Sequence, residues 1–187
     1  MTRGLLWLIG GIVLGGIAHL GMILLLPRIA QDDAYGRLVP VAPVNTMTTL
    51  AAPTAGHEMM PFLDPAIASA VCRYDLSKGP LQLSVKVSQA YTSVSFYTRL
   101  GVAYYTVNDR AAGRGAIDLS LMTEQQRADM PEEEDVTAAD RLIVESPSAT
   151  GLILIKALAP EPGLMDMARE SVASAQCKPL PPTAPPS

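Results

Sequence analysis

A long apolar run near the N-terminus limits what this chain can fold into. Residues 5–26, LLWLIGGIVLGGIAHLGMILLL, contain no formally charged side chain. As an α-helix with a rise of about 1.5 Å per residue, the run would be roughly 33 Å long, which matches the ~30 Å hydrocarbon core of a bilayer. Arg3 and Arg28 flank it, and Pro27 is expected to end the helix. We therefore predict a transmembrane anchor over residues 1–28 that crosses the lipid bilayer through residues 5–26.

A cleaved signal peptide is the alternative interpretation of this run. The apolar region of a signal peptide usually has only about 7–15 residues, and a small-x-small cleavage site follows it. The run here is longer, and the following PRIAQDDAYG contains no clear A-x-A site, so we favour the uncleaved anchor. Positive charges near the two ends of the run are nearly balanced, but a tail of four residues is easily retained in the cytoplasm. We therefore expect a cytoplasmic N-terminus and an exported remainder.

Two glycines in the apolar run could pack a pair of membrane helices. Gly11 and Gly15 form a GxxxG pattern, which allows two helix backbones to approach closely. The pair predicts transmembrane packing in a homodimer. The alternative is that no specific dimer forms, because glycine is common in membrane helices.

Proline usage divides the rest of the chain. Residues 29–61 mix Pro, Ala and Thr without a lasting period of 3.6 or 2, which predicts a flexible tether. Residues 178–187, KPLPPTAPPS, predict a disordered Pro-rich tail. The segment between them, residues 62–177, is predicted to be an exported, β-rich domain.

The predicted domain contains several short strands with alternating apolar residues. The clearest is LQLSVKV, in which Leu81, Leu83, Val85 and Val87 would face one side. Similar patterns occur in YTSVSFYT, VAYYTV, AIDLSLM and RLIVE, whereas GLILIKALA is apolar enough to be a central strand. Short connections such as residues 99–101 favour antiparallel pairing.

Three segments of this domain show helical patterns. LDPAIASAVC begins with Asp64 as a plausible N-cap and Pro65 at the first helical position. Thr123 and Gln126 fit a capping box for a short helix that ends near Met130. An amphipathic pattern from Leu164 to Cys177 predicts a last helix. We therefore predict an α+β fold, mainly an antiparallel β-sandwich or open barrel with a C-terminal covering helix, preceded by one transmembrane helix.

Searches for known chemistry exclude most function classes. The chain has 14 Lys and Arg against 18 Asp and Glu, without a basic cluster, which argues against a nucleic-acid partner. Its only histidines, His19 and His57, lie in the apolar run and in the predicted tether, outside the predicted domain. No HExxH, CxxC, Walker, GxSxG or dinucleotide fingerprint occurs. We therefore expect no catalytic residues, no bound metal, no cofactor and no enzymatic activity.

One polar cluster remains as a candidate binding site. In residues 104–115, YYTVNDRAAGRG, an arginine follows a tyrosine-containing strand. An arginine near tyrosines at the end of a strand could bind a carboxylate or a phosphate through two parallel hydrogen bonds. The candidate ligand-binding residues are Tyr104, Tyr105, Asp109 and Arg110. The alternative is that Arg110 stabilises its own turn through a nearby carbonyl group or through Asp75.

The chain has only two cysteines, one near each border of the predicted domain. If Cys72 and Cys177 are both exported, an oxidising compartment favours a disulfide between them. Such a bond would close a loop of about 100 residues and connect the last helix to the start of the domain. The alternative is two free, buried thiols in a cytosolic domain.

Residues 73–115 contain three recognisable motifs, a DLS-GP step, a Y-S-V strand and an Arg-x-x-Gly corner. The residues of these motifs are Asp75, Leu76, Ser77, Gly79, Pro80, Tyr91, Ser93, Val94, Arg110 and Gly113. In these motifs the chain resembles the DUF1254 family, a family of domains of unknown function. The plan of anchor, tether, β domain and two cysteines is similar to that of short, membrane-anchored alphaproteobacterial members.

The resemblance implies a β-sandwich fold in the cell envelope, with no established activity. It places the anchor in a bacterial inner membrane and the domain in the periplasm. Larger relatives carry a second β domain of the DUF1214 family, which implies a separate companion protein of that family as the partner. We therefore expect a non-enzymatic interaction or assembly module. The alternative is a small-molecule binding protein or hydrolase that uses the Arg/Tyr corner of residues 104–110.

Overall fold

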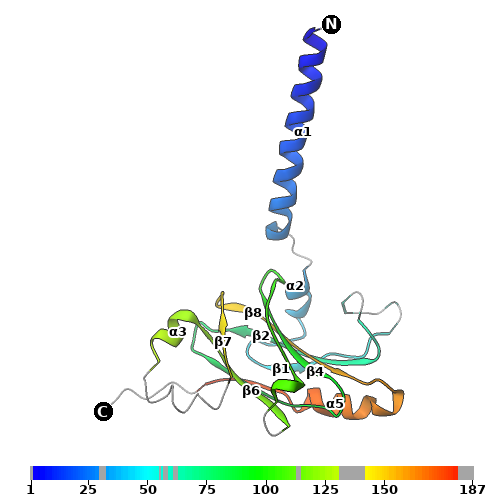
Figure 1. The fold of residues 1–187 in the computed structure, drawn as a ribbon, viewed down its shortest axis with the longest axis vertical. Helices are drawn as coiled ribbons and strands as arrows, with labels where there is room; N and C mark the ends of the chain where they lie inside the picture. The colour runs from blue at the N-terminus through cyan, green and yellow to red at the C-terminus, as the bar shows by residue number, and fades with distance from the viewer. Residues whose placement is uncertain are drawn as a thin grey trace. The chain divides into compact units, whose positions relative to one another are not determined.

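The computed structural model describes residues 2–29, 33–54, 56, 59–60, 63–112, 115–130 and 142–180. The chain divides into two compact units, residues 1–33 and residues 34–187. Figure 1 shows their elements along the chain, coloured from blue at the N-terminus to red at the C-terminus. The predicted Pro-rich tail beyond residue 180, the acidic run of residues 131–135, His57 and Gly113 lie outside the described residues.

The first unit is the helix α1 (Thr2–Ile29), which matches the predicted apolar helix. Residues Thr2–Leu26 have a hydropathy of 2.2, and none of the most apolar window is buried within the chain. By length and composition, α1 is the one described helix that could cross a membrane. The helix continues to Ile29, so Pro27 does not end it as predicted. A proline removes a hydrogen bond to the turn before it, but the residues after it can remain helical.

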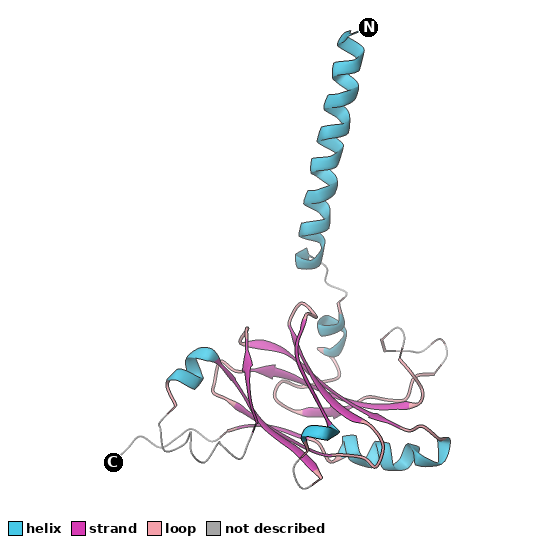
Figure 2. Ribbon diagram, in the orientation of Figure 1, coloured by secondary structure: helices cyan, strands magenta, loops and turns pink. Residues whose placement is uncertain are grey.

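The second unit contains two β-sheets and confirms the predicted α+β sandwich (Figure 2). The five-stranded sheet has the order β1 (Met47–Thr49), β2 (Ile67–Asp75), β8 (Thr150–Leu158), β4 (Thr92–Thr98) and β5 (Ala103–Asn108). The four-stranded sheet has the order β7 (Leu142–Ser146), β6 (Ala116–Thr123), β3 (Leu81–Lys86) and β9 (Gln176–Pro179). The described strands form two separate open sheets, not a closed barrel.

Alternating side chains from both sheets form the core. In β3, Leu81, Leu83 and Val85 are buried, whereas Lys86 is exposed, as the alternation predicted. The predicted central strand, β8, lies between β2 and β4. Its Ile153 is fully buried in the core between the sheets. Burial on alternate positions of several strands explains why these segments were recognisable from sequence.

The connection between β6 and β7 includes the predicted capping box. Thr123 Oγ1 accepts a hydrogen bond from the Gln126 backbone N–H (3.2 Å), and Gln126 Oε1 accepts one from the Thr123 N–H (3.0 Å). The helix that follows, α3, spans Glu124–Ala128 and ends before Met130. Strands β6 and β7 pair in parallel, whereas the other strand pairs are antiparallel. A parallel pair requires a crossover, so tight hairpins do not account for this part of the fold.

The predicted helix at residues 64–72 is wrong, because residues 67–75 form strand β2. The Asp64 carboxylate accepts a hydrogen bond from the Ala66 N–H (2.8 Å), so the side chain caps a turn and not a helix. The strand then pairs with β8 along its whole length, from Ile67 opposite Leu158 to Asp75 opposite Thr150. These long-range pairs override the local helix signal.

The predicted C-terminal helix is shorter than expected. It comprises a 3-10 turn, η2 (Pro162–Leu164), and the helix α5 (Met165–Ala173). Ala168 and Val172 of α5 are buried in the main core, so this helix covers the sandwich as predicted. The predicted end at Cys177 is wrong, because that residue lies on β9, which pairs with β3. Lys178 and Pro179, assigned to the tail, also belong to β9.

Much of the segment predicted as a tether is part of the folded unit. Residues 34–38 form the helix α2 (Ala34–Leu38), and β1 pairs with β2. Leu38 and Ala42 are buried in a second cluster, against Val71 of β2 and Leu152 of β8. The folded unit therefore begins near residue 34, and its first residues cover the face of the five-stranded sheet opposite the main core.

Candidate functional site

The predicted Arg/Tyr corner lies at the end of β5 and in the 3-10 turn that follows. Asn108 caps the start of this turn, η1 (Asp109–Ala111), because its Oδ1 accepts a hydrogen bond from the Arg110 N–H (3.1 Å). Arg110 is exposed and Asp109 is half-buried. Within the described part of the chain, no hydrogen bond or ion pair joins the Arg110 side chain to Tyr104 or Tyr105. The structure therefore places the four residues in one region but does not bring them together, and ligand binding there stays a prediction.

An irregularity in β5 directs Tyr104 toward the other sheet. Phe96 pairs with Tyr105 and Tyr97 pairs with Ala103, which leaves Tyr104 between the two pairs. An extra residue of this kind changes the direction of a side chain. The Tyr104 hydroxyl lies 3.1 Å from the Tyr74 hydroxyl, whereas the Tyr105 ring remains 37% exposed. Both rings contact Phe96, with centroids 6.1 Å and 6.0 Å apart.

Tyr74 is the centre of a buried hydrogen-bonded cluster between the two sheets. Its side chain is fully buried, and its hydroxyl lies 2.9 Å from Ser146 Oγ on β7 and 3.3 Å from the Tyr97 carbonyl oxygen. Ser146 Oγ in turn donates to the Ser148 carbonyl oxygen (2.6 Å). Because each hydroxyl finds a partner, the cluster can be buried without a large desolvation cost. We call Tyr74, Tyr104 and Ser146 the hydroxyl cluster.

A glycine makes room for this cluster. Gly151 lies opposite Tyr74 in the β2–β8 pair. A Cβ atom at Gly151 would collide with the Tyr74 hydroxyl and the Tyr97 carbonyl oxygen. The position therefore needs a residue without a side chain, because two polar groups occupy that space.

Tyr104 of the hydroxyl cluster holds its proton more firmly than an ordinary tyrosine. Burial raises the pKa of Tyr104 far above its usual value, with a further rise from its hydrogen bond to Tyr74. A tyrosine that holds its proton this firmly is a poor general base at neutral pH. The cluster therefore connects the two sheets through its hydrogen bonds.

The DLS-GP residues of the family resemblance form the turn between β2 and β3. Asp75 accepts a hydrogen bond from the Ser77 N–H (2.9 Å), and the hydrogen bonds from Ser77 lower the pKa of the Asp75 carboxyl group. The Gly79 N–H donates to the Leu76 carbonyl oxygen (3.1 Å), and Gly79 has a φ of 135°. Leu76 itself is buried. These residues therefore determine the shape of a turn and its packing.

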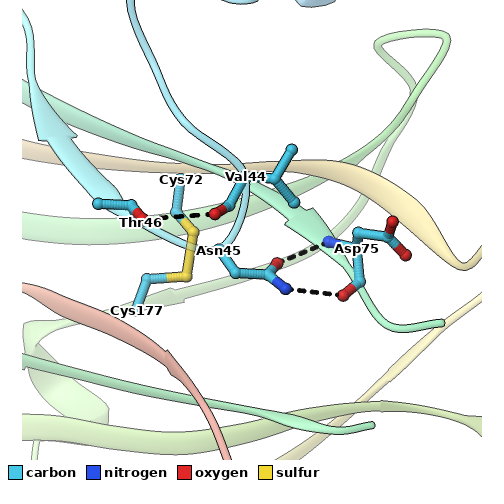
Figure 3. The surroundings of a disulfide bond; sticks show 6 residues. All are labelled: Val44, Asn45, Thr46, Cys72, Asp75 and Cys177. Carbon is cyan, nitrogen blue, oxygen red and sulfur yellow. Dashed lines mark hydrogen bonds between the residues drawn. A yellow bond between two sulfur atoms is a disulfide. The ribbon is translucent and has the colours of Figure 1, made fainter. Parts of the chain in front are cut away.

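Asn45 extends the edge of β2 with its side chain. Its Nδ2 donates to the Asp75 carbonyl oxygen (2.9 Å), and its Oδ1 accepts from the Asp75 N–H (2.7 Å), as Figure 3 shows. The backbone of Asn45 adopts a φ of 56°, a conformation that asparagine tolerates better than most residues. The side-chain amide thus replaces a backbone amide in the hydrogen-bonding pattern of the sheet.

The predicted disulfide between Cys72 and Cys177 is confirmed (Figure 3). Its Cα atoms lie 6.5 Å apart, and the two residues are separated by 105 positions in the sequence. Cys72 lies on β2 and Cys177 on β9, so the bond joins the five-stranded sheet to the four-stranded sheet. The alternative of two free thiols is therefore wrong.

A cavity of about 360 Å³ lies away from the predicted corner, beside α5. Its lining is mostly apolar and includes Leu50, Ile67, Met165 and Val172. The charged residue of its lining, Arg169, pairs with Asp166 of the same helix (3.4 Å). Among the described residues, no group of three or more His, Cys, Asp or Glu side chains could hold a metal ion.

Sequence reasoning missed the hydroxyl cluster because it read the start of β2 as a helix. Read as a strand, Ala68, Ala70, Cys72 and Tyr74 occupy alternate positions and share the face that packs in the main core. That alternation was the available signal for a buried Tyr74. Nothing in the sequence indicated Ser146 or Gly151 as its neighbours.

Together, the apolar helix and the disulfide-linked two-sheet domain define a β-sandwich protein with an N-terminal helix of membrane-spanning length. The family model described as protein of unknown function (DUF1254) matches residues 44–179. The chain belongs to this family, which confirms the resemblance seen in the sequence. A search of curated proteins finds no match.

Two solved bacterial structures are similar to this chain. The VPA0106 protein from Vibrio parahaemolyticus has 13% sequence identity and a TM-score of 0.55, over 83% of this chain and 39% of that chain. A protein from Burkholderia cenocepacia has 14% identity and a TM-score of 0.48, over 84% of this chain and 46% of that chain. This chain therefore spans less than half the length of either protein. At 13% identity, the similarity to the VPA0106 protein shows only that the two proteins share a fold.

Proposed function

We propose that this protein is a non-enzymatic interaction module of the bacterial cell envelope. In this proposal, α1 anchors the chain in the inner membrane with a cytoplasmic N-terminus. The β domain lies in the periplasm and binds a separate companion β-domain protein of the DUF1214 family. The observation that carries the proposal is the uncharged edge of strand β5.

The four edge strands of the described sheets differ in how they resist pairing with another chain. β9 (QCKP) carries a lysine and a proline, β7 carries Glu145 paired with Arg127 (2.8 Å), and β1 has only three residues. Charged residues, prolines and short length all discourage a further strand. β5 (AYYTVN) has six residues, with neither a charge nor a proline. It is therefore the edge best suited to accept a strand from a partner.

The side chains of β5 also suit an interface. Ala103, Tyr105 and Thr106 are exposed, and Val107 is buried in the core. An added strand would bond to the open backbone side of β5 and cover the exposed part of the Tyr105 ring. Tyrosine is enriched in protein interfaces because it supplies a large apolar area and a polar group.

Two further observations support the proposal. The match leaves more than half of the VPA0106 protein outside the aligned region, so a similar domain can occur within a larger polypeptide. A separate companion would supply such additional structure to this chain. The Cys72–Cys177 disulfide supports export, because disulfides persist in oxidising compartments such as the periplasm.

Co-purification of the tagged full chain from bacterial membranes tests the proposal. We expect a DUF1214 protein to co-purify with the natural chain and to be lost with Thr106→Lys, which places a charge on the β5 edge. Gln176→Lys is the matched control, because it adds the same charge to the β9 edge, and it should retain the partner. Equal recovery with both variants, or no such partner with the natural chain, would contradict the proposal.

A further inference from the structure

The turn between β4 and β5 presents two large apolar side chains to solvent. Leu100 is 55% exposed and Val102 is 61% exposed. The turn is well fixed: the Thr98 N–H donates to the Val102 carbonyl oxygen (2.9 Å), and the Gly101 N–H donates to the Thr98 carbonyl oxygen (3.0 Å). Gly101 supplies the positive φ of 79° that the turn requires. The two apolar side chains therefore project from an ordered hairpin tip.

The start of the folded unit lies beside this tip. The Arg99 guanidinium carbon lies 4.4 Å from the centre of the Tyr35 ring on α2. Arg73 also stacks on this ring, at 4.9 Å, and its Nη1 donates to the carbonyl oxygens of Val39 (3.2 Å) and Ala42 (3.1 Å). These contacts hold the α2 segment and the hairpin tip together as one surface.

This surface combines apolar, aromatic and basic groups. Leu100 and Val102 are its exposed apolar groups, and Tyr35 and Arg99 lie next to them. We call it the α2–tip surface. Its residues are Tyr35, Arg99, Leu100 and Val102. Apolar tips next to tyrosine and arginine are typical of the boundary between the hydrocarbon core and the headgroups of a membrane.

The covalent link to α1 favours a bilayer as the occupant of this surface. Five Cα–Cα steps separate Ile29, the last residue of α1, from Ala34, the first of α2. At about 3.6 Å per step, they span at most roughly 18 Å. A free tether over residues 29–61 would have allowed the domain to move far from a membrane, but residues 34–50 are part of the fold. If α1 crosses a bilayer, Tyr35 cannot lie far from its surface.

We propose that the α2–tip surface lies against the bilayer that holds α1. Leu100 and Val102 enter the region between the headgroups and the acyl chains, and Tyr35 with Arg99 lies among the headgroups. The inference rests on the proposed anchoring of α1 and adds a second membrane contact, made by the folded domain. This contact would restrict the orientation of the β5 edge relative to the membrane.

Tryptophan fluorescence in vesicles tests this contact. The full chain has one tryptophan, Trp7, which lies in α1. In a Trp7→Phe background, Leu100→Trp places a single reporter at the tip, and Val102→Trp is a second reporter of the same surface. Tyr91→Trp is the matched control, because Tyr91 is 46% exposed at the other end of β4. The seven residues of β4 separate the two ends by roughly 23 Å.

Each variant is reconstituted alone into vesicles of phosphatidylcholine and phosphatidylglycerol with brominated acyl chains, which quench nearby tryptophan. At positions 100 and 102, we expect blue-shifted tryptophan emission that the brominated lipid strongly quenches. At position 91, we expect emission that the lipid does not quench and that aqueous acrylamide does. If acrylamide quenches all three positions equally and the brominated lipid quenches none of them, the proposal is overturned. The same result is expected if the natural occupant of the surface is a protein partner, because that partner is absent from these vesicles.

A separate measurement distinguishes failure of the anchor from failure of the contact. Vesicles carrying each variant are washed at alkaline pH and floated on a density gradient. If α1 is not an anchor, the protein separates from the vesicles, and both proposals fail. If the protein floats but positions 100 and 102 show no lipid quenching, the anchor stands and the surface contact is refuted.

Discussion

Two connections join the sheets of the sandwich, and they differ in kind. Both begin on β2: Cys72 bonds covalently to β9, and Tyr74, two residues later, reaches Ser146 on β7 through a hydrogen bond. β9 and β7 are the opposite edges of the four-stranded sheet. One strand of the first sheet thus contacts both edges of the second.

The two connections stabilise the domain in different ways. The disulfide limits the freedom of the unfolded chain, and it depends on the redox conditions. The hydroxyl cluster exists only in the folded state, where its stability depends on complete burial and on the space at Gly151. Three changes separate these contributions, and a fourth tests a group outside both connections; they are given from the largest expected effect to the smallest. In each, the full chain in detergent is unfolded with urea and followed by circular dichroism.

Removing the disulfide should have the largest effect. The loop between Cys72 and Cys177 spans 105 positions, for which the chain-entropy model gives about 4.7 kcal/mol. We expect Cys72→Ala with Cys177→Ala to reduce the free energy of unfolding by an amount approaching this value. Reductant should destabilise the natural chain similarly and leave the double variant unchanged. A natural chain insensitive to reductant would show that the bond contributes nothing.

Filling the space at Gly151 should damage the other connection without touching the disulfide. The new methyl group of Gly151→Ala would collide with the Tyr74 hydroxyl and the Tyr97 carbonyl. Overpacking of this kind costs about 3 kcal/mol. Gly163→Ala is the matched control, because no atom lies within 4 Å of a Cβ at Gly163. Similar stability of the two variants would refute the role assigned to Gly151.

Removing a single hydroxyl group should weaken the cluster less. Tyr74→Phe keeps the ring but leaves Ser146 and Tyr104 without their shared partner, which should cost about 2 kcal/mol. The loss should be the same with and without reductant, since the cluster acts on the folded state. A loss seen only in the oxidised protein would show that the two connections depend on each other.

Acid should reveal the smallest effect, which belongs to neither connection. The hydrogen bonds from Ser77 lower the pKa of Asp75 below 3.8 in the folded state, so its contribution to stability is present above that pH. It is lost as the pH falls from 3.8 through the folded pKa. We expect the stability of Asp75→Ala to depend less on pH in this window than that of the natural chain. Parallel curves for the natural chain and Asp75→Ala would contradict this assignment.

Local patterns predicted those parts of the fold that local interactions determine. The apolar run, the alternation in β3 and β4, and the Thr123 capping box all need only neighbours in sequence. The prediction failed where a distant strand decides the conformation. Residues 67–75 pair with β8, and Cys177 pairs with Leu83 of β3, so both became strands despite helical signals.

The same reasoning explains the outcome at the candidate site. The cysteine pair could be predicted, because two cysteines have only one pairing. The corner residues Tyr104 and Arg110 were chosen for their chemistry, but the irregularity after Phe96 sends Tyr104 inward. The tether prediction relied on composition, which does not show that Leu38 and Ala42 contact the sheet.

The position of the disulfide has a consequence for proteolysis. The segment between Cys72 and Cys177 includes β3 to β8 and α5. A protease that cuts the backbone once within this segment produces two fragments that remain covalently joined. The cut protein would keep its mobility on a non-reducing gel and separate into two bands only after reduction.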